Sequence, residues 1–214
     1  MKTKSLICFD MDGTLIDSKE EHIQSFKQTA KKNNLKIPTN RELVKQFGPG
    51  IEKVIKKIYP RISSSKYKQF IEDYVDAHEK NSGLVKAFPH VKDALLKLKK
   101  HFKLGIVSNT HHEAILDLLE SAKIPTKLFD VIIGEDDAKA KPAPDEILLA
   151  EKLTKSNAKY MVGDTIFDIK AGKKANCKTI GVLTGIHNME QLMKTEPDIL
   201  AASVAILPDI LLNN

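Results

Sequence analysis

Cysteine, tryptophan and long apolar runs are scarce in this sequence. Its 214 residues include two cysteines and no tryptophan, and only 6% of them are aromatic. Cys8 and Cys177 lack the spacing of a disulfide framework or a cysteine zinc site, so we expect two buried free thiols. The longest apolar stretches, such as 6–9 and 104–107, are too short to span a bilayer, and the N-terminal residues do not resemble a cleaved secretory leader. We therefore expect a soluble, cytoplasmic protein with no membrane partner.

The formal charge of +6 and the pI near 9.1 raise the question of nucleic-acid binding. Most lysines, however, fall in helix-like segments such as 92–103, where solvated helix faces explain them. The sequence has no basic motif and few aromatic residues that could stack on bases. We therefore expect no nucleic-acid partner, although the surplus charge can attract anionic substrates.

The order of apolar and helical patterns predicts an α/β fold. A short apolar run at 5–9 stops abruptly at Asp10, which predicts a buried strand that opens into a tight loop. Helical periodicity interrupted by turn signals then covers 16–82 and predicts about four short helices. After Pro89, helix-like segments alternate with expected strands at 104–107, 131–133, 160–162, 179–183 and 204–207. Such alternation is typical of a Rossmann-like parallel sheet covered on both faces, with the helical block inserted after the first strand.

Polar residues follow several of the expected strands. In an open parallel sheet, ligands bind beyond the carboxyl ends of the strands. The residues found there are Asp10, Asp12, Thr14, Ser108, Asn109, Lys141, Asp164 and Asp168. Alone, each has a simpler explanation, such as a turn, a helix cap or a solvated lysine. Their joint placement after separate strands favours a common site.

Such a site would be suited to phosphoryl transfer. Several carboxylates in one pocket need a cation to neutralise them, and oxygen ligands suit Mg²⁺. Lys141 and the Ser108 hydroxyl could then hold a phosphoryl group. Asp10 lies at the strand tip, where it could act as the nucleophile. Asp12 could donate a proton to the leaving oxygen and later accept one from the attacking water.

At these residues the sequence resembles the haloacid dehalogenase-like hydrolase superfamily, in the branch of phosphoglycolate phosphatase and beta-phosphoglucomutase. The similar segments are FDMDGTLIDS (9–18), VSNT (107–110), AKPAPDEI (140–147) and VGDTIFDI (162–169). The stretch LFDVIIGEDD (128–137) is similar as well. The resemblance covers nearly the whole chain. It implies an α/β core of residues 1–15 and 87–214 and a mobile helical cap of residues 16–86.

The resemblance also implies a role for each matching residue. Asp10 would be the nucleophile and a magnesium ligand, and Asp12 the general acid and base, which binds the metal through its backbone carbonyl. Asp164 would be the carboxylate ligand of Mg²⁺, and Asp168 would ligate or orient it through water. Lys141 would stabilise the negative charge of the nucleophile and the phosphate. The remaining phosphate-binding residues would be Thr14, Ser108 and Asn109.

The sequence leaves the substrate open. The leading hypothesis is hydrolysis of a small phosphorylated metabolite, either phosphoglycolate or a sugar phosphate, by a monomer or homodimer. The same core residues would serve a phosphomutase. Asp12 argues against a dehalogenase, and the complete set of motifs argues against a non-enzymatic binding protein. In the cap, the turn at 48–50 with Lys53 nearby is the expected substrate-facing loop, and His111 and His112 could line the pocket.

Overall fold

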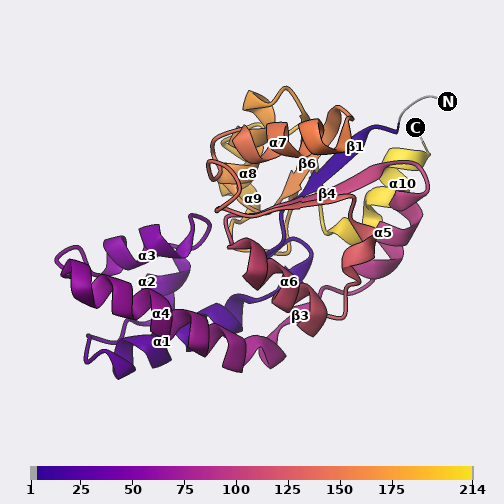
Figure 1. Ribbon diagram of the computed structural model, residues 1–214. Coiled ribbons are helices and arrows are strands. Elements are labelled where there is room, and N and C mark those ends of the chain that lie inside the picture. The colour runs from indigo at the N-terminus through magenta and orange to yellow at the C-terminus, as the bar shows by residue number, and fades with distance from the viewer. Residues whose placement is uncertain (1–3, 214) are drawn as a thin grey trace.

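A computed structural model describes residues 4–213 of the chain (Figure 1). Its main sheet has six parallel strands in an order that differs from their order in the sequence. From one edge to the other they are β5 (Val131–Ile133), β4 (Lys103–Val107), β1 (Leu6–Phe9), β6 (Ala158–Gly163), β7 (Lys178–Val182) and β8 (Ile199–Ala201). Strand β1 therefore lies in the interior of the sheet, and the residues that follow it lie at the middle of the carboxyl edge.

Helices cover both faces of this sheet, because successive residues of each strand point to opposite sides. Ile7 and Phe9 belong to one hydrophobic cluster, whereas Leu6 and Cys8 belong to the other. Four elements pack in the first cluster: α5 (Val91–Lys99), α6 (His112–Ser121), α10 (Leu207–Leu212) and the short helix η3 (Val204–Ile206). The second cluster contains residues of α7 (Asp145–Thr154) and α8 (Ile166–Lys174). The predicted α/β class and two-sided parallel sheet are confirmed.

The remaining short elements lie in the connections. They are η2 (Thr126–Leu128) before β5 and α9 (Met189–Met193) between β7 and β8. Cys8 and Cys177 are both buried free thiols, as expected. Among residues 4–213, no helix combines the length and apolar character that crossing a membrane requires.

Four helices separate β1 from the rest of the α/β core, in agreement with the predicted helical insertion. They are α1 (Lys19–Lys32), α2 (Asn40–Val44), α3 (Ile51–Ile58) and α4 (Ser64–Asn81), followed by η1 (Ser82–Leu84). Figure 1 shows them as a separate group beside the carboxyl edge of the sheet. They have a hydrophobic cluster of their own, in which Phe26, Ile55 and Phe70 are fully buried. We call α1–α4 the helical insertion.

A two-stranded ribbon connects the insertion to the core. Strand β2 (Ile16–Asp17) pairs antiparallel with β3 (Lys86–Ala87), so the outgoing and returning chains run side by side. Helical structure was expected from Ile16, but α1 begins only at Lys19. Ile16 pairs with Ala87, 71 positions later in the chain, and local periodicity does not reveal such a tertiary contact.

The expected strand at 204–207 is wrong. Residues Val204–Ile206 form the 3₁₀-helix η3, which leads into α10, and the last strand is β8 at Ile199–Ala201. Pro208 explains the difference, because its fixed φ and missing N–H suit the first turn of a helix and not a strand. Val204 and Leu207, three positions apart, are both buried in the cluster beneath α5.

Candidate active site

The loop after β1 brings Asp10 to the carboxyl edge of the sheet and turns sharply at Gly13. Gly13 has φ of +78°, a conformation that side chains other than glycine rarely adopt. A Cβ atom there would lie 2.7 Å from Oδ2 of Asp164, so glycine also permits the close approach of the loop that follows β6. The Thr14 hydroxyl lies 3.0 Å from Asp10 Oδ2 and 3.3 Å from Asp164 Oδ1. Thr14 is therefore buried between two carboxylates.

Lys141 links the candidate carboxylates from the opposite side. Its ammonium Nζ donates to Asp10 Oδ1 at 2.6 Å, to Asp168 Oδ1 at 2.7 Å and to the Val107 carbonyl at 2.8 Å. All three ammonium protons have acceptors, and the side chain is only 2% exposed. Burial alone would lower the pKa of Lys141, but Asp10 and Asp168 raise it above its ordinary value. Lys141 is thus a fixed buried cation.

Asp10, Asp164 and Asp168 each contribute a carboxylate oxygen to one cluster, and these oxygens lie within 4.8 Å of one another. Burial, the largest cause, raises the pKa of Asp10 to about 7 and that of Asp164 well above its ordinary value. One lysine does not neutralise three buried carboxyl groups, so the cluster favours a bound cation. Three hard oxygen donors fit Mg²⁺ by their chemistry.

Two of the carboxylates also hold backbone groups in place. Asp168 forms a capping box at the start of α8, where its Oδ2 accepts from the Thr165 backbone N–H at 2.9 Å and the Thr165 hydroxyl at 2.6 Å. Since Asp168 Oδ1 accepts from Lys141, both of its oxygens are engaged. Asp164 Oδ2 accepts from the Ile186 N–H at 2.7 Å. These contacts fix the orientation of both carboxylates.

Asp12 lies apart from that cluster and faces the helical insertion. Its Oδ1 accepts from the Ser18 hydroxyl at 2.5 Å and lies 3.3 Å from His22 Nε2, while Oδ2 accepts from the Thr110 hydroxyl at 2.9 Å. Burial would raise the pKa of Asp12, but these hydrogen bonds, led by that of His22, lower it to about 2. For His22, burial is likewise outweighed, by Glu21 and Asp12, and its pKa rises to about 9. Asp12 is therefore held as a carboxylate.

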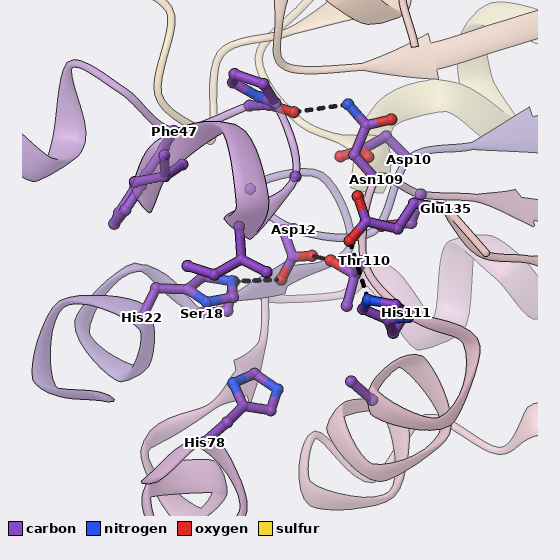
Figure 2. A pocket seen from close by; sticks show the side chains of 18 of the residues that line it. Asp10, Asp12, Ser18, His22, Phe47, His78, Asn109, Thr110, His111 and Glu135 are labelled. Carbon is purple, nitrogen blue, oxygen red and sulfur yellow. Dashed lines mark hydrogen bonds and ion pairs between the residues drawn. The ribbon is translucent and has the colours of Figure 1, made fainter. Parts of the chain in front are cut away.

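Ser108 and Asn109 follow β4, at the same edge of the sheet as Asp10. The Asn109 side chain is already bound, since its Oδ1 accepts from the Lys141 N–H at 2.8 Å. Its Nδ2 donates to the Gly48 carbonyl at 2.8 Å (Figure 2) and lies 3.2 Å from the Lys141 carbonyl. Asn109 therefore fixes the backbone of Lys141 and joins the core to the turn of the helical insertion.

A cavity of about 650 Å³ lies between the carboxyl edge of the sheet and the helical insertion. The core side of it is polar, whereas Phe47, Ile51, Val54 and Ile71 contribute apolar surface from the insertion. The turn at 48–50 lines it as expected, and so does His111. Neither Lys53 nor His112 is among the lining residues. His112 instead lies 2.9 Å from Asp137.

Sequence reasoning did not assign a role to the three residues that contact Asp12, namely Ser18, His22 and Thr110. Thr110 ends the VSNT segment, and its position directly after Asn109 is the signal that could have suggested a role. His22 has no such signal, because a single histidine in an amphipathic helix is indistinguishable from a surface residue. Figure 2 shows the His22 ring directed from the insertion toward Asp12.

The family model that describes haloacid dehalogenase-like hydrolases matches residues 7–182 of the sequence, a range that contains every candidate site residue. The chain belongs to this family. The predicted resemblance is therefore confirmed, and the protein is a hydrolase of the haloacid dehalogenase-like type.

Individual relatives agree with this assignment. The chain is 34% identical over 196 residues to the pyrophosphatase PpaX of Oceanobacillus iheyensis, which covers 90% of this chain and 89% of the relative. It is also 34% identical to PpaX of Anoxybacillus flavithermus, over 96% of this chain and 95% of the relative. The crystal structure of a predicted phosphoglycolate phosphatase from Haemophilus somnus has a TM-score of 0.87 at 22% identity and covers 98% of each chain. At that identity, the structural likeness shows the shared fold of these hydrolases.

Proposed function

We propose that this hydrolase cleaves a small phosphate monoester, of the phosphoglycolate or sugar-phosphate type, by transferring the phosphoryl group to Asp10 with the help of Mg²⁺. The observation that carries the proposal is the position of Lys141 Nζ, 2.6 Å from Asp10 and 2.7 Å from Asp168. This arrangement holds the Asp10 carboxylate beside a fixed positive charge at the cavity. Mg²⁺ held by Asp10, Asp164 and the Asp12 carbonyl, with Asp168 nearby, would neutralise charge on the phosphoryl oxygens.

In the first step, an oxygen of Asp10 would form a bond to phosphorus while the bond from phosphorus to the leaving oxygen breaks. Asp12 would donate a proton to that leaving oxygen and, in the second step, take one from the water that hydrolyses the aspartyl phosphate. Because three hydrogen bonds stabilise the ionised form of Asp12, the acid role requires some of them to weaken when substrate binds. Ser108 and Lys141 would hold the phosphoryl oxygens.

A second substrate class, inorganic pyrophosphate, is suggested by the relatives that are called pyrophosphatases. The cavity favours an organic leaving group instead. Its 650 Å³ exceed what pyrophosphate fills, and the side chains of Phe47, Ile51 and Val54 offer apolar contacts that a second phosphate cannot use. A phosphomutase would use the same catalytic residues and pass the phosphoryl group to a sugar hydroxyl.

The same proposal assigns residues 1–15 and 87–214 to the catalytic core and residues 16–86 to a cap that closes over the substrate. Support comes from the contacts between them at the cavity, such as that of Asn109 Nδ2 with the Gly48 carbonyl at 2.8 Å. Closure would exclude bulk water during the transfer. A cytoplasmic location fits the proposed substrates, which are small phosphorylated metabolites.

The test is a screen of the purified protein against phosphoglycolate, several sugar phosphates and pyrophosphate, with Mg²⁺ and with excess chelator. We expect phosphate release from an organic monoester that stops on chelation and returns with Mg²⁺. Sugar-phosphate isomerisation without phosphate release would indicate a mutase, and exclusive cleavage of pyrophosphate would overturn the monoester assignment. Activity that survives chelation would contradict the metal assignment. Asp10→Asn serves as the control for contaminating phosphatases.

A further inference from the structure

A second group of potential metal ligands lies in the helical insertion, outside the carboxylate cluster. It consists of Glu21 and His22 in the first turns of α1 and His78 in the last turn of α4. Each offers one ligand atom, and these atoms lie within 4.8 Å of one another. Glu21 is fully buried, His78 is 7% exposed, and the His22 side chain is 21% exposed. We call these three residues the Glu21–His22–His78 cluster.

Glu21 Oε1 accepts from the Ser25 hydroxyl at 2.5 Å, but several other polar atoms of the cluster lie close together without completing hydrogen bonds. Glu21 Oε1 lies 2.8 Å from His78 Nδ1, and Glu21 Oε2 lies 3.2 Å from His22 Nδ1. Even so, Glu21 Oε2 and both ring nitrogens of His78 have no hydrogen-bond partner among residues 4–213. Buried polar atoms are rarely left in that condition, because an unsatisfied group costs about 1–3 kcal/mol.

A shared cation would resolve this arrangement. Ligands of a tetrahedral ion point at the ion and not at one another, and with bonds of about 2.0–2.1 Å they lie about 3.3 Å apart. The separations of 2.8 and 3.2 Å, which start from the two different oxygens of the Glu21 carboxylate, are close to that spacing. Two imidazoles and one carboxylate are also a donor set that suits Zn²⁺ and similar transition ions, unlike the all-oxygen cluster of Asp10, Asp164 and Asp168.

The surroundings of His22 fit a metal-bound imidazole. With Nδ1 directed toward Glu21, its Nε2 lies 3.3 Å from Asp12 Oδ1. Histidines that bind a metal through one nitrogen usually donate the other N–H to a carboxylate, which fixes the ring. The Tyr74 hydroxyl lies 3.0 Å from the same Nδ1, so a bound ion would replace this hydrogen bond. Figure 2 shows His22 and His78 on the same side of the cavity, both contributed by the insertion.

We propose that Glu21, His22 and His78 form a binding site for Zn²⁺ or a closely similar divalent transition-metal ion, separate from the carboxylate site for Mg²⁺. The ion would join the beginning of α1 to the end of α4. It would also hold the His22 ring with its Nε2–H directed at Asp12. Binding of the ion in the helical insertion would thereby be coupled to the position of Asp12 in the loop after β1.

The proposal is tested by equilibrium dialysis of the metal-free, full-length protein against Zn²⁺ with millimolar Mg²⁺ present to occupy the carboxylate site. We expect one tightly bound Zn²⁺ per chain, and affinity at least tenfold weaker in His78→Gln and in Glu21→Gln. Asp164→Asn, which alters the carboxylate site, and His112→Gln, which alters a half-buried histidine outside both sites, should bind Zn²⁺ like the unaltered protein. Circular dichroism shows whether each variant is folded.

A second measurement does not depend on variants. In the unaltered protein with Mg²⁺, added Zn²⁺ should raise the melting temperature and shift the ring ¹⁵N resonances of two histidines, because the ion binds the folded state. Absence of bound Zn²⁺ in excess Mg²⁺ would overturn the proposal. So would loss of the bound Zn²⁺ in Asp164→Asn together with its retention in His78→Gln, since the ion would then occupy the carboxylate site.

Discussion

Lys141 Nζ lies 2.6 Å from Asp10 Oδ1, although 131 positions separate the two residues in the chain. Asp10 ends the interior strand β1, whereas Lys141 lies in the loop between β5 and α7. The two meet because β5, β4 and β1 are neighbours in a parallel sheet, so their carboxyl ends reach the same edge. This ion pair connects the fold to the proposed chemistry.

Replacing the proposed nucleophile should abolish turnover without unfolding the protein. In Asp10→Asn, the amide cannot attack phosphorus as a carboxylate does, so we expect kcat with a chromogenic phosphate ester to fall by several orders of magnitude. The amide has nearly the same shape, and circular dichroism should be unchanged. Near-normal turnover by the folded variant would remove Asp10 from its assigned role.

Lys141→Ala should impair both stability and turnover. The change leaves the buried carboxylates of Asp10 and Asp168 without their lysine, and breaking a buried ion pair costs about 3–5 kcal/mol. Urea denaturation without divalent cation should show a loss of this order, and Mg²⁺ should recover part of it. The matched control is Lys174→Ala, which removes only an exposed contact with the Pro142 carbonyl. Equal stability of the two variants would contradict the role of the ion pair.

Glu146 should make the protein less stable as the pH rises. Both of its carboxylate oxygens are buried with no hydrogen-bond partner among the described residues, and burial raises its pKa from 4.5 to about 8. Between these values the folded state retains a proton that the unfolded state releases, so stability falls as pH rises through this window. Relative to the unaltered protein, Glu146→Gln should therefore gain stability at pH 8–9, on the order of 4 kcal/mol.

The check is urea denaturation of Glu146→Gln and the unaltered protein at several pH values, without added divalent cation. Below about pH 4.5 the advantage of the variant should vanish, because Glu146 is then neutral in both states. Asp145→Asn, at the exposed neighbouring position, provides the control for a changed net charge. A difference between Glu146→Gln and the unaltered protein that does not vary with pH would contradict the assignment.

Gly172 should tolerate no side chain, because α8 approaches β6 and β7 closely there. A Cβ atom would lie 2.7 Å from Thr179 Cγ2 and 2.8 Å from Met161 Cβ. Gly172→Ala should therefore reduce the free energy of unfolding by about 1–3 kcal/mol. The same change at Gly83, where a Cβ would meet nothing within 4 Å, is the control. A melting temperature that is lower for Gly83→Ala than for Gly172→Ala would contradict this steric explanation.

The sequence alone determined much of the fold and most of the candidate cluster. Apolar runs that end shortly before Asp10 and Asp164 indicate buried strands and their carboxyl ends. A strand that is buried on both faces has apolar residues at consecutive positions, which the sequence shows directly. The strand expected at 204–207 failed for a related reason. A short apolar run is compatible with either a strand or a buried helical turn, and packing beneath α5 decided in favour of the helix.

Only the tertiary structure decided which residues contact the candidate site residues. Nothing local shows that Asn109 holds the backbone of Lys141 and the turn at Gly48, or that His22 lies beside Asp12. The approach of α4 to α1, which brings His78 to Glu21, is equally invisible in the sequence. The pattern of apolar residues indicates whether a side chain is buried. Which residue it contacts depends on how elements that are distant in the sequence pack together.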